Sequence, residues 1–417
     1  MTGSIVHPST PKSDTAQSVV IVGGGLVGLS AALMLARRSI AVTLVELHPF
    51  RPVSHENYLD LDSRNTALSR RSVQIYSELG LWPSLQSHAE PILQVSISEI
   101  GGFGKATLVA KNERVESFGQ VMENRWLGNR LLEMAQSEPL VTLKDGFRVQ
   151  SVTQSESEAI LSIEDVDTAE TQILRTPLLV AADGAESFCR KALGIKDERK
   201  DFNQTAVVAV VETSKPHEQV AFERFGPQGP LALLPLAGSH RRSVVWIAKK
   251  GEEAPLLDPA NDGHFLSLLQ QAFGSRAGEF KRVGRRGAYP LIQVLAKEQV
   301  KGRAVILGNA AHTLHPVAGQ GFNLCLRDAD TLSRMLEAHL ATHEWSSQAK
   351  LAKLLRRYEI LRSKDQKRVV NFCNSVVHGF THSNPVLRFG RNLGLVLFEH
   401  VPGAKQLVAN YAMGLKS

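Results

Sequence analysis

The stretch GGGLVG, Gly23 to Gly28, follows the uncharged run SVVIV and precedes LSAALMLARR. A β-branched, uncharged run before a glycine turn predicts a buried strand, and the segment after the turn predicts a helix. A second predicted strand, AVTLVE, ends at Glu46. We therefore predict a βαβ unit in which Gly23, Gly25 and Gly28 have the GxGxxG spacing of a dinucleotide-binding turn.

Each residue of this unit has a physical role in binding a dinucleotide. Gly23 permits the tight turn, Gly25 lets the backbone approach a pyrophosphate, and Gly28 lets helix and strand pack closely. The N-terminus of the helix supplies free N–H groups and a partial positive charge to the phosphates. We expect Glu46 to accept hydrogen bonds from the adenosine ribose. The alternative is that the glycines only pack, and the motif does not distinguish NAD from FAD.

A second glycine-rich loop, GNAAHTLHPVAGQGFNL, begins at Gly308 between the predicted strand RAVIL and an amphipathic helix. A third motif, ADGAESFCRKALGI, places Asp183 and Gly184 after the strand TPLLVA, and Ser187 is expected to cap the helix that follows. A single NAD needs only one phosphate-binding loop. A longer cofactor with a ribityl chain and a flavin ring can use both loops, so the pattern favours FAD.

These motifs predict an α/β fold with a Rossmann-like FAD-binding domain, a mostly antiparallel substrate sheet domain and a C-terminal helical segment. The predicted parts are a disordered tail (1–17), a discontinuous FAD-binding domain (18–199 and 296–345), a substrate-binding sheet domain (200–295, with part of 96–118) and the helical segment (346–417). The uncharged run from Val19 to Ala36 is long enough to resemble a membrane span, but three glycines interrupt it.

Composition excludes several classes of protein. The three cysteines, Cys189, Cys325 and Cys373, form no CxxC pair, which is typical of a reduced, intracellular chain. The first 17 residues contain no apolar region, so we expect no secretory signal. His312 and His315 have HxxH spacing without an apparent carboxylate or cysteine partner, so we expect a role in loop structure and no metal site. The net charge is +7, but no aromatic-basic motif suggests nucleic acid.

The basic character is concentrated at the C-terminal end. Lys350 to Ser417 holds twelve lysines and arginines against three acidic residues, so this segment carries +9 and the rest of the chain −2. One interpretation is a solvated helix face packed on the FAD domain. The other is a surface that docks on anionic lipid or on protein partners, with apolar residues at the membrane interface. Those apolar residues are Val396, Leu397, Phe398, Val401 and Leu407.

The three motifs, in this order and at these separations, resemble the FAD-dependent aromatic hydroxylases with the para-hydroxybenzoate hydroxylase fold. The resemblance covers residues 18 to 400, and four stretches resemble the ubiquinone-biosynthesis branch: DLDSRNTALSRRSVQIYSELGLW, AFERFGPQGPLALLPL, GRRGAYPL and GNAAHTLHPVAGQGFNL. It implies an oxidoreductase that uses NAD(P)H and O2 through a flavin hydroperoxide. It implies a polyprenylated phenol of the 2-polyprenyl-6-methoxyphenol type as substrate. It also implies a cytoplasmic protein, peripheral on the inner face of the membrane or bound to ubiquinone-biosynthesis partners.

The resemblance also assigns residues to the cofactor and the substrate. Gly23, Gly25, Gly28 and Glu46 would hold the ADP part. The other expected cofactor contacts are Arg64 (phosphates or ribityl chain), Gln120 and Val121 (ribityl chain and flavin), Arg130 (on the next helix), Asp183 and Gly184 (flavin and NAD(P)H), and Gly308 and Asn309 (ribityl chain and pyrophosphate). Pro316, Gly319, Gln320, Gly321 and Asn323 would line the flavin ring. Tyr289 would lie on the substrate side, and no general base is identified.

One departure and several alternatives remain. Most of the family has Gly-Asp where this chain has Gly308-Asn309; the ubiquinone branch can carry Gly-Asn, and an amide both accepts and donates hydrogen bonds. A halogenase or prenyl reductase is an alternative on the same fold, but the tryptophans are too far apart for the halogenase WxWxIP motif. A plain NAD dehydrogenase leaves the late loop unexplained. A different aromatic substrate, or an FAD-binding protein with a structural role, also remains open.

Overall fold

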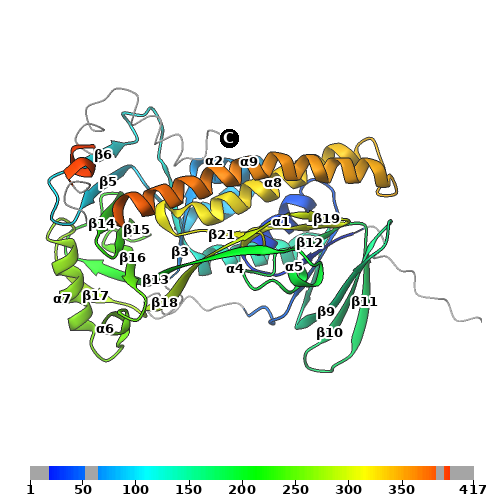
Figure 1. Ribbon diagram of the computed structural model, residues 1–417, viewed down its shortest axis with the longest axis horizontal. Helices are drawn as coiled ribbons and strands as arrows, with labels where there is room; N and C mark the ends of the chain where they lie inside the picture. The colour runs from blue at the N-terminus through cyan, green and yellow to red at the C-terminus, as the bar shows by residue number, and fades with distance from the viewer. Residues whose placement is uncertain (1–17, 52–63, 382–388, 395–417) are drawn as a thin grey trace, which may run out of the picture.

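The computed structural model describes residues 18–51, 64–381 and 389–394. A parallel sheet lies near the centre of an elongated molecule, a larger sheet lies at one end, and a three-stranded sheet lies toward the other (Figure 1). Two long helices run along one side. The expected tail (1–17) and the apolar residues chosen for the membrane interface (396–407) lie outside the described residues.

The central sheet confirms the predicted βαβ unit. Its strand order is β19-β20-β12-β1-β2-β8, and every pairing is parallel except that of β19 with β20. The strands are β1 (Val19–Val22), β2 (Val42–Glu46), β8 (Val141–Asp145), β12 (Leu179–Ala181), β19 (Val300–Lys301) and β20 (Ala304–Ile306). Helix α1 (Leu26–Ala36) follows β1, as the sequence predicts.

Both faces of this sheet are buried, which explains why β1 is apolar throughout. Val19 and Ile21 belong to the core under α1, α4 (Asn124–Ser137) and α8 (Gln320–Leu340). Val20 and Val22 belong to a second core, shared with a three-stranded antiparallel sheet that the sequence did not predict. Its strands are β9 (Phe147–Gln154), β10 (Ala159–Asp165) and β11 (Thr171–Thr176). Burial on two faces removes the alternation that a half-exposed strand shows.

The larger sheet confirms the predicted antiparallel sheet. Its order is β21-β18-β13-β16-β15-β14-β5-β6, with β17 beside β13, and only β14 and β5 pair in parallel. The strands are β5 (Gln94–Glu99), β6 (Lys105–Val109), β13 (Asp197–Thr213), β14 (Val220–Gly226), β15 (Gly229–Pro235), β16 (Arg241–Lys249), β17 (Phe280–Val283), β18 (Gly287–Ala296) and β21 (His312–Thr313). Helices α6 (Ala254–Leu257) and α7 (Asp262–Phe273) lie beside it (Figure 1). The strand β21 comes from the late glycine loop, which therefore touches both sheets.

Smaller elements and one long helix complete the fold. A third small sheet contains β3 (Asn65–Ser69), β7 (Gly119–Glu123) and β4 (Glu90–Pro91), and the short helices are α2 (Arg70–Glu78), α3 (Trp82–Leu85) and α5 (Phe188–Ala192). The 34-residue helix α9 (Gln348–Thr381) contacts β19 of the parallel sheet as well as β14 and β15 of the larger one. In the part of the chain that the structure describes, no helix is long and apolar enough to cross a membrane.

Candidate active site

The three sequence motifs meet at one edge of the parallel sheet. Gly23 follows β1, Asp183 follows β12 by two residues, and Gly308 follows β20 by two residues. Parallel strands end at the same edge, so motifs that lie far apart in the chain become neighbours there. The Ala182 N–H donates to the Val22 carbonyl at 2.7 Å, which fixes two of these strand ends together.

The glycines of the first loop differ in what surrounds them. Gly23 has φ +107°, and a Cβ there would lie 2.4 Å from the Ala182 carbonyl oxygen. A Cβ on Gly28 would lie 1.8 Å from the Gly23 carbonyl oxygen. A Cβ on Gly25 would meet nothing within 4 Å, and Gly25 is the N-cap of α1 without a side-chain cap. The surroundings of Gly23 confirm the predicted tight turn, and those of Gly28 confirm the predicted close packing of helix and strand. At Gly25 the backbone N–H groups are open to a ligand.

Glu46 is tied to the first loop. Its Oε2 accepts a hydrogen bond from the Gly24 N–H at 2.5 Å, and its Oε1 accepts one from the His48 N–H at 3.0 Å. Each carboxylate oxygen can accept a second hydrogen bond. The carboxylate therefore holds the loop and keeps the capacity to accept a ribose hydroxyl.

The late loop packs directly against the first helix. Gly308 is buried with φ +62°, and a Cβ there would lie 3.1 Å from Val27 Cγ1 of α1. Only glycine fits such a position without strain. Asn309 is exposed, and its side chain forms no hydrogen bond to any residue within the described ranges. The two glycine loops thus lie side by side, with the Asn309 amide available to a ligand.

The middle motif is a helix cap. Asp183 accepts hydrogen bonds from Ser187 Oγ at 2.5 Å and from the Cys189 N–H at 3.0 Å. Ser187 Oγ accepts from the Arg190 N–H at 2.9 Å, which confirms the predicted cap of α5. Gly184 has φ +87° and open space beside it.

Arg190 is a residue of this region that sequence reasoning missed. It is 1% exposed and donates from Nη1 to the Ala310 carbonyl at 2.8 Å and from Nη2 to the Ala185 carbonyl at 2.7 Å. Nη2 also lies 3.1 Å from an Asp197 carboxylate oxygen. Arg190 therefore joins the middle motif to the late loop. Arginine is seldom buried, so its position in a basic helix gave no signal of this role.

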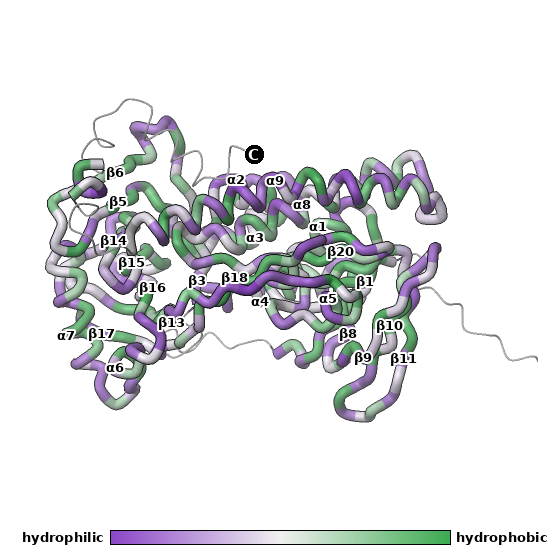
Figure 2. The backbone as a smooth tube through the Cα atoms, viewed as in Figure 1, coloured by the Kyte–Doolittle hydropathy of each residue, from purple (hydrophilic) through white to green (hydrophobic). Residues whose placement is uncertain are grey.

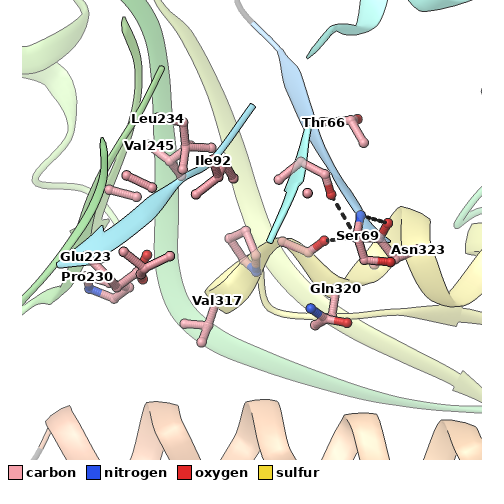
Figure 3. Close-up of a pocket in the computed structure, with 18 of the residues that line it drawn as sticks. Thr66, Ser69, Ile92, Glu223, Pro230, Leu234, Val245, Val317, Gln320 and Asn323 are labelled. Carbon is pink, nitrogen blue, oxygen red and sulfur yellow. Dashed lines mark hydrogen bonds between the residues drawn. The ribbon is translucent and has the colours of Figure 1, made fainter. Parts of the chain in front are cut away.

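A cavity of about 580 Å³ lies between the late loop and the larger sheet (Figure 3). All five residues predicted to line the flavin ring border it: Pro316, Gly319, Gln320, Gly321 and Asn323. The other walls come from β3, from β5 and β6, from β14 to β16, and from Phe372 and Val376 of α9. Most of these side chains are apolar, and the volume suits a small organic ligand.

Asn323 holds the cavity wall together. Its Nδ2 donates to the carbonyls of Ala67 and Gly319, both at 2.8 Å. Its Oδ1 accepts from the Ser69 N–H and from Ser72 Oγ, both at 2.7 Å; Figure 3 shows the contact with Ser69. These four bonds use the whole hydrogen-bonding capacity of the amide. At 1% exposure, Asn323 joins the loop to β3 through its side chain.

The two histidines of the loop have different partners. His312 Nε2 lies 2.7 Å from Asp328 Oδ2, and Arg362 Nε donates to Asp328 Oδ1 at 2.5 Å. The expectation that His312 lacks a carboxylate partner is thus wrong, because helix α8, which follows the loop, places Asp328 beside it. No cluster of three potential metal ligands occurs among the residues that the structure describes.

His315 borders the cavity and is neutral. Its Nε2 is 3.2 Å from Gln204 Oε1, and its Nδ1 accepts from the Val317 N–H at 3.3 Å. Burial lowers the pKa of His315 to about 4. Both ring nitrogens are thus engaged with the protein, Nε2 as the donor.

The remaining predicted residues lie outside the cavity wall. The Arg64 guanidinium lies over the Tyr289 ring, 5.8 Å from its centre. Tyr289 pairs across the sheet with Ala206, which pairs with Ile247, a residue that does border the cavity. Tyr289 therefore lies on the same face of the sheet, two strands away.

Three further predicted residues make contacts within the protein. Gln120 Nε2 is 3.5 Å from Ser117 Oγ. The Val121 side chain is fully buried in an apolar core. Arg130 pairs with Glu133 and donates from Nε to the Ser84 carbonyl at 3.3 Å. Cofactor contacts of these residues stay predictions.

Comparison with known proteins gives a consistent result. The family model described as FAD binding domain matches residues 16–373. The chain is 31% identical over 411 residues to ubiquinone hydroxylase UbiL of Rhodospirillum rubrum, covering 99% of this chain and 92% of the relative. It is 29% identical over 401 residues to 3-demethoxyubiquinol 3-hydroxylase of Escherichia coli, covering 95% and 98%. The structure of p-nitrophenol 4-monooxygenase PnpA from Pseudomonas putida shares the fold, with TM-score 0.78, 18% identity and coverage of 95% and 98%.

Proposed function

The chain belongs to the FAD-binding domain family and is an FAD-dependent aromatic monooxygenase, and on this premise we propose that it hydroxylates a polyprenylated phenol in ubiquinone synthesis. The substrate would be of the 2-polyprenyl-6-methoxyphenol type. Two relatives that align along nearly the whole chain are, by name, a ubiquinone hydroxylase and a 3-demethoxyubiquinol 3-hydroxylase, which supports this pathway. The observation that carries the proposal is the mostly apolar cavity that the late glycine loop borders.

The residues at the sheet edge fit FAD. The open backbone at Gly25 and the uncapped start of α1 suit a pyrophosphate, and Glu46 can still accept a ribose hydroxyl. Asn309 would reach the ribityl chain or the pyrophosphate. The flavin ring would lie beside the loop from Pro316 to Asn323.

The start of α8 suits the reacting end of the flavin. Gly319 is its N-cap without a side-chain cap, and Gln320 and Gly321 of the first turn border the cavity. The free N–H groups and the helix dipole favour negative charge at this place. When bound, FAD would take electrons from NAD(P)H and activate O2 for transfer of one oxygen atom to the aromatic ring. The apolar walls would exclude water and hold the ring.

We also propose that helix α9 docks the protein on an anionic lipid surface. Seven of its basic residues are exposed and form no ion pair with a carboxylate of the described chain: Lys350, Lys353, Arg356, Arg357, Lys364, Lys367 and Arg368. Ile360 and Leu361 lie among them with 51% and 46% of their surface exposed. Figure 2 shows this mixture of hydrophilic and hydrophobic residues along α9. A prenylated substrate would be concentrated in the membrane, which gives such a surface a use.

Not every cation of α9 is available for docking. Arg362 is buried, with Nε 2.5 Å from Asp328 Oδ1 and Nη2 2.6 Å from Asp365 Oδ2. Arg327 of α8 also pairs with Asp365, at 2.9 Å. This part of the charge packs α9 on α8, as the first interpretation of the basic segment predicts. Only the seven exposed cations carry the docking proposal.

Product analysis tests the function. The purified protein is supplied with FAD, O2, NADH or NADPH, and a short-tailed 2-prenyl-6-methoxyphenol. We expect phenol-stimulated oxidation of one nicotinamide and a product that is heavier by one oxygen atom. A Gly25→Val variant without FAD serves as the control. An FAD-loaded protein that yields no oxygenated product from this or any other phenol would leave only a structural role for FAD.

A further inference from the structure

Among the described residues that border the cavity, Glu223 of β14 is the only carboxylic acid. Ala221, Glu223 and Phe225 lie on one face of this strand, by the two-residue period of a strand, and border the cavity together with Phe222. Figure 3 shows Glu223 beside Pro230, on the sheet side of the cavity, with Val317 and Gln320 on the loop across from it. A carboxyl group thus faces the place where a ligand would meet the flavin-binding loop.

The neighbours of Glu223 offer it no partner. It pairs in register with Ile97 of β5 on one side and with Ala232 of β15 on the other, and Ala232 pairs with Val245. All three neighbours are apolar and border the cavity. Among the residues within the described ranges, none forms a hydrogen bond or an ion pair with Glu223.

The charged groups nearby are committed elsewhere. Glu99, on the same face of β5 as Ile97, is held by Arg391 Nη2 at 2.8 Å and by Asn392 Nδ2 at 2.5 Å. Arg224 projects to the opposite face, where it donates to the Phe273 carbonyl. The residues that α9 contributes to the wall, Phe372 and Val376, carry no charge.

With no compensating cation, burial raises the pKa of Glu223 to about 7. A group whose pKa lies near the working pH can both take up and release a proton, which is the property required of a general base. The other titratable group of the wall, His315, is already hydrogen-bonded through both nitrogens. An unpaired carboxyl in an apolar cavity costs stability, and such groups concentrate at functional sites.

We propose that Glu223 is a catalytic residue that accepts the proton of the substrate's phenolic hydroxyl. The inference rests on the proposed function, because it needs a phenol in this cavity. The phenolic O–H bond breaks, its electron pair stays on oxygen and enriches the ring, and a new O–H bond forms on the carboxylate. The ring carbon then takes the oxygen atom that the monooxygenase reaction supplies. That carbon loses its own proton to solvent as aromaticity returns, and Glu223 returns its proton to the phenolic oxygen.

The test compares a phenol with its methyl ether, without turnover. FAD-bound protein without NAD(P)H is titrated with 2-methoxyphenol and with 1,2-dimethoxybenzene, at pH values below and above 7. A carboxylate accepts a hydrogen bond from the phenol but not from the ether, and a charged hydrogen bond is worth roughly tenfold in affinity. We expect the ratio of the affinity for the phenol to that for the ether to increase roughly tenfold as the pH rises through about 7. In Glu223→Gln this ratio should not change with pH. An unchanged increase of the ratio in Glu223→Gln would overturn the inference.

Controls separate the outcomes. Glu198→Gln, an exposed carboxyl of β13, removes the same charge and should leave the preference intact. If Glu223→Gln does not fold, Glu223→Asp withdraws the carboxylate by one methylene; a weaker but still pH-dependent preference supports the inference, and an unchanged one overturns it. A Glu223-dependent preference without any hydroxylated product would sink the proposed function alone. Hydroxylation with the same pH profile in Glu223→Gln would sink the inference alone.

Discussion

The Asn323 Oδ1 accepts a hydrogen bond at 2.7 Å from the backbone N–H of Ser69, a residue 254 positions earlier in the chain. The same amide donates to Ala67 and Gly319, so one side chain joins β3 to the late loop on the cavity wall. Asn323→Asp would place a carboxylate against two carbonyl oxygens. We expect a loss of about 2–4 kcal/mol in the free energy of unfolding, since each buried polar group left without a partner costs about 1–3 kcal/mol. Denaturant unfolding measures this, with the exposed Asn371→Asp as a near-neutral control; equal loss in both variants would contradict the assignment.

Gly25 and Gly28 should respond differently to the same substitution. Gly25→Val has room within the protein, so the chain should fold, but the side chain would occupy the space of the pyrophosphate and abolish FAD binding. Gly28→Val would force a Cβ to 1.8 Å from the Gly23 carbonyl oxygen, so this variant should fail to fold. Bound flavin per protein and thermal unfolding measure the two effects. Full flavin content in folded Gly25→Val would refute the site.

Asn309 should affect the cofactor and not the fold. Asn309→Asp keeps an acceptor, and we expect the FAD affinity to change by no more than about tenfold, the difference between a neutral and a charged hydrogen bond. Asn309→Leu can neither donate nor accept and should weaken FAD further. Because the side chain is exposed, both variants should unfold like the parent in the absence of FAD. Fluorescence titration with FAD measures the affinities, and parental affinity in both variants would mean that Asn309 does not touch the cofactor.

His315 should make the fold sensitive to acid. Its pKa is about 4 in the fold against 6.5 when unperturbed, so the fold favours the neutral ring. This contribution is complete above pH 6.5 and is lost as the pH falls toward 4, at a cost of about 3 kcal/mol. His315→Gln should remove this part of the acid sensitivity, whereas the exposed His264→Gln should not. The measurement is the free energy of unfolding of the parent and of each variant across this pH range. Glu223 titrates in the opposite direction, but it does so in parent and variant alike and drops out of their difference. Parallel curves of unfolding free energy against pH for the parent and His315→Gln would contradict the prediction.

The exposed cations of α9 should bind anionic vesicles. We expect sedimentation with anionic liposomes at low salt and release at high salt, since each basic residue near such a surface contributes about 1 kcal/mol and salt screens it. Replacement of Arg356, Arg357, Lys367 and Arg368 by Glu should abolish the binding. The same reversal at four exposed cations outside α9, Lys111, Arg114, Lys196 and Arg285, is the control. Equal sedimentation with neutral liposomes, or none with anionic ones, would refute lipid docking and leave protein partners.

The sequence predicted the elements whose signals are local. The turn at Gly23, the close contact at Gly28 and the cap at Ser187 each depend on neighbouring residues, and the structure confirms them. The sheet β9–β11 was missed although burial alternates along β10. Its place in the fold depends on a core shared with β1, which lies far away in the chain.

The parts of the site that escaped prediction depend on distant contacts. The burial of Arg190 and the pairing of His312 with Asp328 follow from packing between segments, which spacing alone does not encode. Glu223 was missed for a similar reason. In the sequence it is one acidic residue before an arginine, and only the sheet register shows that its neighbours are all apolar.

The order of the strands has a consequence for synthesis on the ribosome. A nascent chain completes β1, β2, β8 and β12 long before β20 (Ala304–Ile306) is synthesised. In the finished protein, β20 pairs with the edge of β12. Until then that edge is open to association with other chains, and neither the late loop nor its contact with Val27 exists. The cofactor pocket can therefore close only after β20 and the late loop have been synthesised. A truncated product ending before residue 300 would carry the first glycine loop yet be unable to retain flavin, and would be a natural target for chaperones.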